Sequence, residues 1–187
     1  MDPLMGVFAA FGLSASAGLN AFIPLLVLAI IGRFTDWIQL SARWEALTSG
    51  WVIGVLVILV LIEFFTDKIP AVNHINDVIQ TFIRPTAGAI AFAATVGVIT
   101  DIHPVLAILA GLFVAGSVHA AKSVVVRPAV TATTAGAGNV PVSIAEDLIA
   151  AALSVLAVVI PVLVASILVV VTAYIVWRLW GRRGAPS

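Results

Sequence analysis

The fold of this protein depends on the stretch Gly12-Leu-Ser-Ala-Ser-Ala-Gly-Leu-Asn20-Ala21, in the middle of the first apolar segment. A simple membrane anchor would carry leucine and valine at these positions. Small residues let helix backbones approach closely, and a buried asparagine amide needs hydrogen-bond partners that packing does not supply. Two interpretations follow: a kinked helix packed in a bundle, or a helix that breaks near Asn20 beside a polar cavity.

The composition identifies the surroundings of the chain as a lipid bilayer. Hydrophobic residues make up 62% of the sequence and charged residues 10%, whereas soluble domains contain about half and about one quarter. The formal net charge is zero, which argues against nucleic acid as a partner, and the absence of cysteine excludes disulfides and thiolate chemistry. We predict an all-α integral membrane protein with about six transmembrane segments and no separate soluble domain.

The apolar runs and the turn residues between them place the segments. The six runs cover about 4–31, 50–65, 86–100, 105–121, 144–160 and 162–179. An amphipathic helix at about 75–84 precedes the third segment, and Pro85 suits that segment's first turn. The capping-box pattern Ser143-Ile-Ala-Glu146 predicts the start of the fifth helix. We expect a loop over the Thr/Gly/Ala-rich residues 131–141 and a break near Pro161.

The distribution of Lys and Arg predicts the orientation. With six crossings, Arg33 and Arg43 fall on the outer side. The inner side receives Lys68, Arg84, Lys122, Arg127, Arg178, Arg182 and Arg183. Both termini are therefore predicted to be cytoplasmic.

A second small-residue stretch, Gly111-Leu-Phe-Val-Ala-Gly-Ser-Val-His119-Ala120, aligns without a gap with the first and pairs Asn20 with His119. Each stretch lies in the first segment of a three-helix half: residues 1–101, which include the amphipathic helix, and residues 102–187, which end in a basic tail. Three crossings per half would make the halves inverted repeats, with broken or kinked first and fourth segments meeting near the midplane. Coincidence between two alanine-rich stretches is the alternative.

Two groups of polar residues are candidates for function. Amide and ionisable side chains within a membrane usually face a partner or a cavity, and histidine can relay protons. The substrate or permeation group consists of Ser14, Ser16, Asn20, Ser117 and His119. The cytoplasmic binding or gating group consists of Glu63, Asp67, Lys68, Asn73, His74, Asp77 and Arg84. Lys122 and Arg127 are candidates to bind an anion or a lipid headgroup. The alternatives are hydrogen bonds between packed helices for the first group and an ordinary charged loop for the second.

The residue patterns favour transport over catalysis. No Ser/His/Asp grouping or zinc-protease motif is present, and the carboxylate and histidine spacing matches no metal motif. We predict no enzyme activity, no cofactor and no metal site. We expect a small transporter or channel for an ion, a small polar solute or a lipid headgroup, with several copies as one way to enclose a path. The alternative is a non-transporting lipid-binding or scaffold subunit of an envelope complex, and membrane lipids are partners in both cases.

Three polar stretches resemble a bacterial membrane protein family. They are Gly12-Leu-Ser-Ala-Ser-Ala-Gly-Leu-Asn-Ala-Phe-Ile-Pro24, then Phe64-Phe-Thr-Asp-Lys-Ile-Pro70 with Asn73-His-Ile-Asn-Asp77, and residues 139–147. Over nearly its whole length the chain is similar to the domain of unknown function numbered forty-one twenty-six. The resemblance implies a small multi-pass protein of the bacterial plasma (inner) membrane. It implies no activity and assigns no functional residue.

Overall fold

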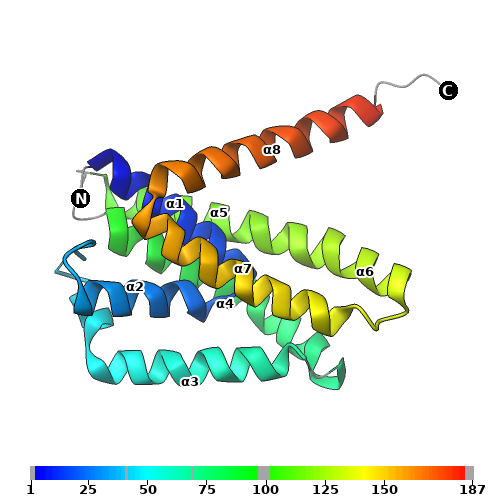
Figure 1. The fold of residues 1–187 in the computed structure, drawn as a ribbon, viewed down its shortest axis with the longest axis horizontal. Coiled ribbons are helices and arrows are strands. Elements are labelled where there is room, and N and C mark those ends of the chain that lie inside the picture. Colours follow the sequence, from blue (N-terminus) through cyan, green and yellow to red (C-terminus); the bar gives the residue numbers. More distant parts are fainter. Residues whose placement is uncertain (1–2, 41, 69, 97–101, 184–187) are drawn as a thin grey trace.

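The computed structural model of this protein describes residues 3–40, 42–68, 70–96 and 102–183. All regular structure in these ranges is helical, which confirms the all-α class (Figure 1). The elements are α1 (Pro3–Leu19), α2 (Phe22–Phe34), η1 (Glu45–Thr48), α3 (Gly50–Thr66), α4 (Pro70–Val96), α5 (Pro104–Ala120), η2 (Ala121–Val126), α6 (Arg127–Thr134), α7 (Asn139–Val159) and α8 (Pro161–Arg183). By length and apolar composition, two helices among the described residues could cross a membrane: 104–134, which joins α5, η2 and α6, and 139–159.

Helices α1 and α2 form an antiparallel hairpin whose turn lies at Asn20 (Figure 1). The Asn20 Oδ1 accepts hydrogen bonds from the backbone N–H groups of Phe22, at 3.1 Å, and Ile23, at 3.0 Å. This side chain therefore caps the start of α2. The predicted break near Asn20 is present, but residues 4–31 are two helices side by side and not one kinked span.

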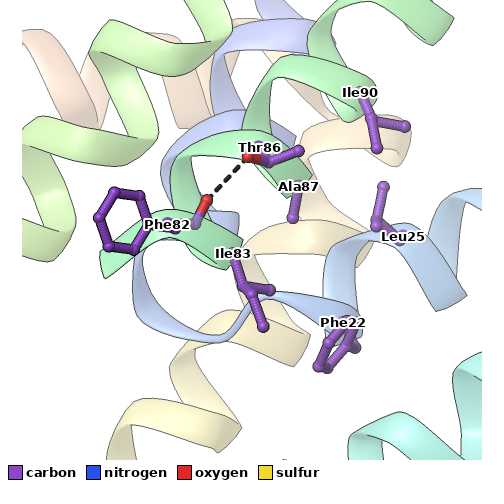
Figure 2. A pocket seen from close by; sticks show the side chains of 7 residues that line it. All are labelled: Phe22, Leu25, Phe82, Ile83, Thr86, Ala87 and Ile90. Atoms are coloured by element: carbon purple, nitrogen blue, oxygen red, sulfur yellow. Dashed lines mark hydrogen bonds between the residues drawn. The ribbon is translucent and has the colours of Figure 1, made fainter. Parts of the chain in front are cut away.

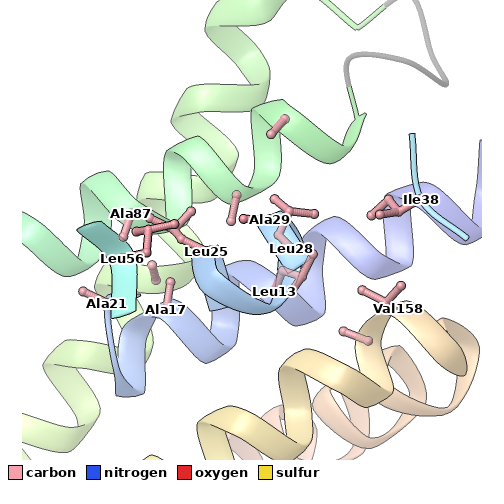
Figure 3. Close-up of a cluster of buried hydrophobic side chains, with 14 residues drawn as sticks. Leu13, Ala17, Ala21, Leu25, Leu28, Ala29, Ile38, Leu56, Ala87 and Val158 are labelled. Carbon is pink, nitrogen blue, oxygen red and sulfur yellow. The ribbon is translucent and has the colours of Figure 1, made fainter. Parts of the chain in front are cut away.

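Small residues allow α1, α4 and α5 to pack closely. A Cβ atom built on Gly111 would lie 2.5 Å from the carbonyl oxygen of Gly88 and 2.6 Å from the Cα of Ala89. Only hydrogen fits at this contact between α4 and α5. The buried core around it is rich in alanine, with Leu13 and Leu28 among its few large members (Figure 3).

The two similar stretches lie side by side in α1 and α5 and run in the same direction. Ser14 Oγ donates to the carbonyl oxygen of Gly111 at 2.9 Å, and Lys122 Nζ donates to the carbonyl oxygen of Leu19 at 2.9 Å. Contacts therefore advance together along both helices. An inverted repeat would run the two stretches in opposite directions, so this pair does not have the expected inverted relation.

The fourth segment is continuous where we expected a break. Helix α5 passes through Gly111 and His119 and continues as a π-helical turn, η2, into α6. Residues 131–134 are also helical, contrary to the predicted loop, because α6 continues the helix of α5 and η2 as far as Thr134. Their threonine hydroxyls bond to carbonyl oxygens one turn earlier. Thr131 Oγ1 donates to Arg127 O at 2.9 Å and Thr134 Oγ1 to Val130 O at 2.7 Å. The connecting turn then uses Ala135 and Gly136, both with positive φ.

Two predicted helix boundaries are also wrong. Helix α7 begins at Asn139, and Ser143 does not cap it, since its side chain is buried inside the helix's packed face. Helix α4 runs through Pro85 without a boundary, because its packing against α1 and α5 supports the helix where proline removes one backbone donor. The predictions for α3, which Ser49 caps, and for the break before Pro161 are correct.

The amphipathic part of α4 presents its apolar face outward. Val78 and Phe82 are 65% and 74% exposed, whereas Gln80 and Arg84 are buried. We expected the apolar stripe to lie at the membrane interface or against the bundle. The described side chains rule out the second of these placements, because the polar face lies against the other helices while Val78 and Phe82 point outward.

Candidate functional site: an ionic network at the hairpin turn

Eight charged side chains gather around the turn between α1 and α2. The acids are Glu63, Asp67, Glu146 and Asp147, and the bases are Lys68, Arg84, Lys122 and Arg127. They are four of the nine acids and four of the nine Lys and Arg residues of the chain, so the cluster is formally neutral. All except Lys68 are classed as buried. We call these eight residues the ionic network.

Glu63 and Arg84 form its most deeply buried pair. The Arg84 Nη2 donates to Glu63 Oε1 at 3.0 Å and the Nε donates to the same oxygen at 3.3 Å, and both side chains are 0% exposed. Glu63 Oε2 also accepts the backbone N–H of Ala21 at 3.1 Å. This carboxylate thus lies at the start of α2, where the helix dipole favours a negative charge.

Glu146 and Lys122 lie on the other side of the turn, at the end of α1. Glu146 Oε2 accepts from Lys122 Nζ at 2.9 Å and from Arg127 Nη2 at 3.0 Å. The same Lys122 ammonium donates to the carbonyl oxygen of Leu19, at the end of α1. A positive charge is favourable at a helix C-terminus, so both helix ends at the turn meet a charge of the stabilising sign.

Asp67 follows α3 and lies among three bases. Its Oδ2 is 3.3 Å from Arg84 Nη2, 3.4 Å from Arg127 Nη2 and 3.9 Å from Lys122 Nζ. Its Oδ1 accepts a hydrogen bond from Asn76 Nδ2 at 2.6 Å. Asp67 therefore connects α3 to α4, η2 and α6.

Asp147 ties the turn itself to α7. Its Oδ1 accepts from Asn20 Nδ2 at 2.9 Å, and its Oδ2 accepts from Lys68 Nζ at 2.9 Å. Lys68 also lies over the ring of Phe64, 3.3 Å from the centroid, which is a favourable cation–π contact. Asn20 thus has two roles, capping α2 and binding a network carboxylate.

His119 connects α5 to the network through two residues of α4. Its Nδ1 is 3.4 Å from Arg84 Nη1, and its Nε2 is 3.2 Å from Thr81 Oγ1. A guanidinium group only donates hydrogen bonds, so Nδ1 is the acceptor. The arrangement therefore fits a neutral imidazole with its proton on Nε2, donated to the threonine hydroxyl.

Two buried polar atoms next to the network have no hydrogen-bond partner among the described residues. They are Ser143 Oγ, in a side chain that is 0% exposed, and Gln80 Oε1. Ser143 lies one helical turn before Glu146, and Gln80 one turn before Arg84. Each therefore shares a helix face with a network residue.

The structure separates the predicted permeation residues. Asn20 and His119 both join the network, Asn20 through Asp147 and His119 through Arg84. The described serines of this group have other roles. Ser14 bonds to the Gly111 carbonyl, Ser16 bonds to the Ala150 carbonyl and the Ser154 hydroxyl, and Ser117 is exposed and bonds within its own helix.

Four of the seven residues of the predicted cytoplasmic group belong to the ionic network and not to an ordinary charged loop. Glu63, Asp67, Lys68 and Arg84 meet there, together with both residues proposed to bind an anion or headgroup, Lys122 and Arg127. Asn73, His74 and Asp77 belong to α4, but their side chains lie outside the described part of the structure.

Sequence reasoning missed the contribution of α7. The capping-box pattern assigns Glu146 to a helix N-terminus, yet Glu146 and its neighbour Asp147 supply half of the network's acids. A signal was present in the pattern of this apolar helix. Ser143, Glu146, Asp147, Ala150 and Ser154 recur at helical spacing and form one small and polar face, which is buried.

The described residues include no group of three or more His, Cys, Asp or Glu side chains placed to hold a metal ion. They do form an apolar groove of about 300 Å³ between α2 and α4 (Figure 2). Its lining includes Phe22, Leu25 and Ile90, and its one hydroxyl, on Thr86, is bonded to the Phe82 carbonyl. The groove thus offers shape and apolar surface but no free hydrogen-bond donor.

Comparison with known proteins places the chain in a family. The sequence model of the domain of unknown function DUF4126 matches residues 7–181, in agreement with the resemblance of the polar stretches. Searches of the curated proteins and of the solved structures find no match.

Proposed function

We propose that this chain, which belongs to the DUF4126 family, is a small membrane transporter or channel whose permeant meets the ionic network at the hairpin turn. The observation that carries the proposal is the network itself. Eight charged groups from five elements converge inside a bundle whose outer surface is apolar.

The outward residues at the height of the network support its position within a bilayer. Val124 is 72% exposed beside Lys122, Leu148 is 66% exposed beside Asp147, and Phe82 is exposed near Arg84. Charge inside and hydrocarbon outside is the reverse of a soluble protein. The network residue Lys122 lies in η2, between α5 and α6. The 17 residues of α5 span about 25 Å on one side of η2, and the 8 residues of α6 span about 12 Å on the other.

A purely structural role explains such a network poorly. Buried ion pairs contribute little net stability compared with apolar packing, because desolvation offsets the Coulomb attraction. Charged groups within membrane segments usually mark ion, proton or substrate pathways. Helix breaks beside them are the sites where many transporters bind their substrates.

The hairpin favours a revised arrangement in the membrane. Helices α3, α4, α5–η2–α6, α7 and α8 would cross, while α1 and α2 would enter and return on one side. The proposal then needs neither six crossings nor inverted repeats. The first turn of α1 and the last turn of α8 lie at opposite ends of the bundle (Figure 1).

The basic residues orient this arrangement. Lys68, Arg178, Arg182 and Arg183 belong to the end at which α8 finishes, and Arg33 and Arg43 belong to the end at which α2 finishes. We therefore place the α8 end in the cytoplasm of a bacterial cell and the start of α1 on the opposite side of the plasma membrane. This revises the expectation that both termini are cytoplasmic.

Flux measurements test the proposal. Purified protein is reconstituted in liposomes, and the uptake of small cations, anions and neutral solutes is compared with that of empty liposomes. We expect uptake of one class, reduced about tenfold by Asn20→Ala and by His119→Ala. An unpaired buried polar group costs about 1–3 kcal/mol, and about 1.4 kcal/mol corresponds to a tenfold change. Ser117→Ala is the matched control, because Ser117 is on the same helix as His119 but exposed. Absence of flux for every class, with folded protein, would refute transport.

The apolar groove of Figure 2 favours one alternative, a non-transporting lipid-binding subunit. An acyl chain fits a groove that lacks free hydrogen-bonding groups. Native mass spectrometry with lipids retained separates the two functions. Stoichiometric lipid binding together with no flux would support the subunit, whereas flux that depends on Asn20 and His119 would support the transporter.

A further inference from the structure

Three cationic groups from three different elements converge on one carboxylate oxygen. Asp67 Oδ2 is 3.3 Å from Arg84 of α4, 3.9 Å from Lys122 of η2 and 3.4 Å from Arg127 of α6. The three bases thus form a cradle around an anionic oxygen. We call Arg84, Lys122 and Arg127 the cationic cradle.

The ionic contacts of Asp67 are longer than those of the other acids of the network. Its three ionic contacts are 3.3 Å or longer, whereas the shortest contacts of Glu63, Glu146 and Asp147 are 2.9–3.0 Å. Asp67 is also the C-terminal cap of α3, a peripheral helix in which only Leu56 and Glu63 are buried among the residues described. A small displacement of this helix end can therefore withdraw Asp67, while Glu146 is fixed within a packed helix.

Withdrawal of Asp67 would leave an unbalanced positive charge. The pair Lys68–Asp147 is neutral by itself, and the cradle's three positive charges would then face only Glu63 and Glu146. An uncompensated charge inside an apolar bundle is strongly unfavourable. The cradle would therefore require another anion.

The chemistry of the cradle specifies which anion. Two guanidinium groups and one ammonium group match the oxygens of carboxylates and phosphates, and guanidinium can bind them with two parallel hydrogen bonds. Ser143 Oγ is fully buried and has no hydrogen-bond partner among the described residues, and it lies one turn before Glu146, which contacts Lys122 and Arg127.

We infer that the cationic cradle is a binding site for a small oxyanion, a carboxylate or a phosphate, and that Asp67 is its internal occupant in this structure. The incoming anion replaces the Asp67 carboxylate. The hydrogen bond from Asn76 to Asp67 Oδ1 stabilises Asp67 in the cradle and so opposes this replacement. The inference rests on the proposed function and deepens it by naming the class of permeant.

Anion-dependent thermal stability tests the inference without any flux measurement. The protein is purified in phospholipid-free detergent and titrated with sodium phosphate or sodium acetate, with sodium chloride keeping the ionic strength constant. We expect Asp67→Asn to bind phosphate or acetate about tenfold or more tightly than the wild type, because a competing charge within 4 Å of the site is removed. Asp36→Asn makes the same change at an exposed position and should behave like the wild type.

Two further variants keep the test decisive if Asp67→Asn folds poorly. Asn76→Ala loosens Asp67 without changing the charge, so it should also increase anion affinity. Arg127→Gln combined with either variant should abolish the gain. Equal anion affinity in the wild type and in the folded variants, or a gain that Arg127→Gln leaves intact, overturns the inference.

Two parallel titrations identify the source of the anion. One uses inorganic phosphate, and the other uses mixed micelles that contain phosphatidylglycerol at the same phosphate concentration. If inorganic phosphate stabilises Asp67→Asn, the ligand is a free oxyanion. If only the phosphatidylglycerol micelles stabilise it, the ligand is a lipid phosphate. Either result supports the cationic cradle as the binding site. Anion binding without flux would refute transport but keep the site, whereas flux without anion binding would refute the site alone.

Discussion

Replacement of Arg84 by methionine tests whether the ionic network is one coupled unit. Arg84 is 0% exposed and donates two hydrogen bonds to Glu63 and one to Asp67. Removing one partner of a buried ion pair costs about 3–5 kcal/mol, because the remaining charge stays buried. Arg84→Met should therefore lower the free energy of unfolding by about that amount. Reversible unfolding in mixed detergent micelles, followed by circular dichroism, measures the change.

A double variant makes this prediction specific to charge. Glu63→Gln keeps an oxygen that can accept the Ala21 N–H but removes the negative charge that Arg84 neutralises. In the Arg84→Met background it should restore about 2 kcal/mol, within the range of coupling energies between contacting residues. Arg33→Met is the control, since Arg33 is exposed and donates to the Thr48 carbonyl, outside the ionic network. A loss for Arg84→Met no larger than that of Arg33→Met, or strictly additive effects of the two changes, would refute the reasoning.

Two further predictions concern packing and topology. Gly111→Ala should destabilise the protein by about 1–3 kcal/mol, because the new Cβ would meet the backbone of α4. Gly54→Ala is the control: nothing lies within 4 Å of its new Cβ, so it should stabilise α3 by up to about 1 kcal/mol. The same unfolding assay compares the two variants. The chain has no cysteine, so Asp36→Cys and Thr133→Cys each introduce a single label site. A membrane-impermeant maleimide should modify Asp36→Cys in intact cells and Thr133→Cys only after permeabilisation, and labelling of both from one side would contradict the proposed arrangement.

Part of the site could be predicted because polar residues are rare in this chain. Asn20, Glu63, Arg84, His119 and Lys122 stood out against apolar surroundings, and the structure brings all of them to one place. Their pairing could not be predicted. The strength of an ion pair depends on distance and burial, which are set when residues far apart in the chain meet, as Asn20 and Asp147 do across 127 positions.

The amphipathic part of α4 shows the same limit for helices. Its periodicity indicated an apolar face and a polar face, but periodicity does not say which solvent each face meets. Packing against α1 and α5 places Gln80 and Arg84 inside and Phe82 outside.

Sequence alone determined the helical class, the family and the break at Asn20, because composition and the capping of a helix by its own neighbouring side chain are local properties. The tertiary structure decided that the chain reverses at this break instead of continuing across. It did so because Glu63 and Lys122, from distant helices, bind the two backbone ends that the turn leaves open. The stretch from Gly12 to Ala21 thus breaks the helix, and the ionic network stabilises the reversal of the chain at that break.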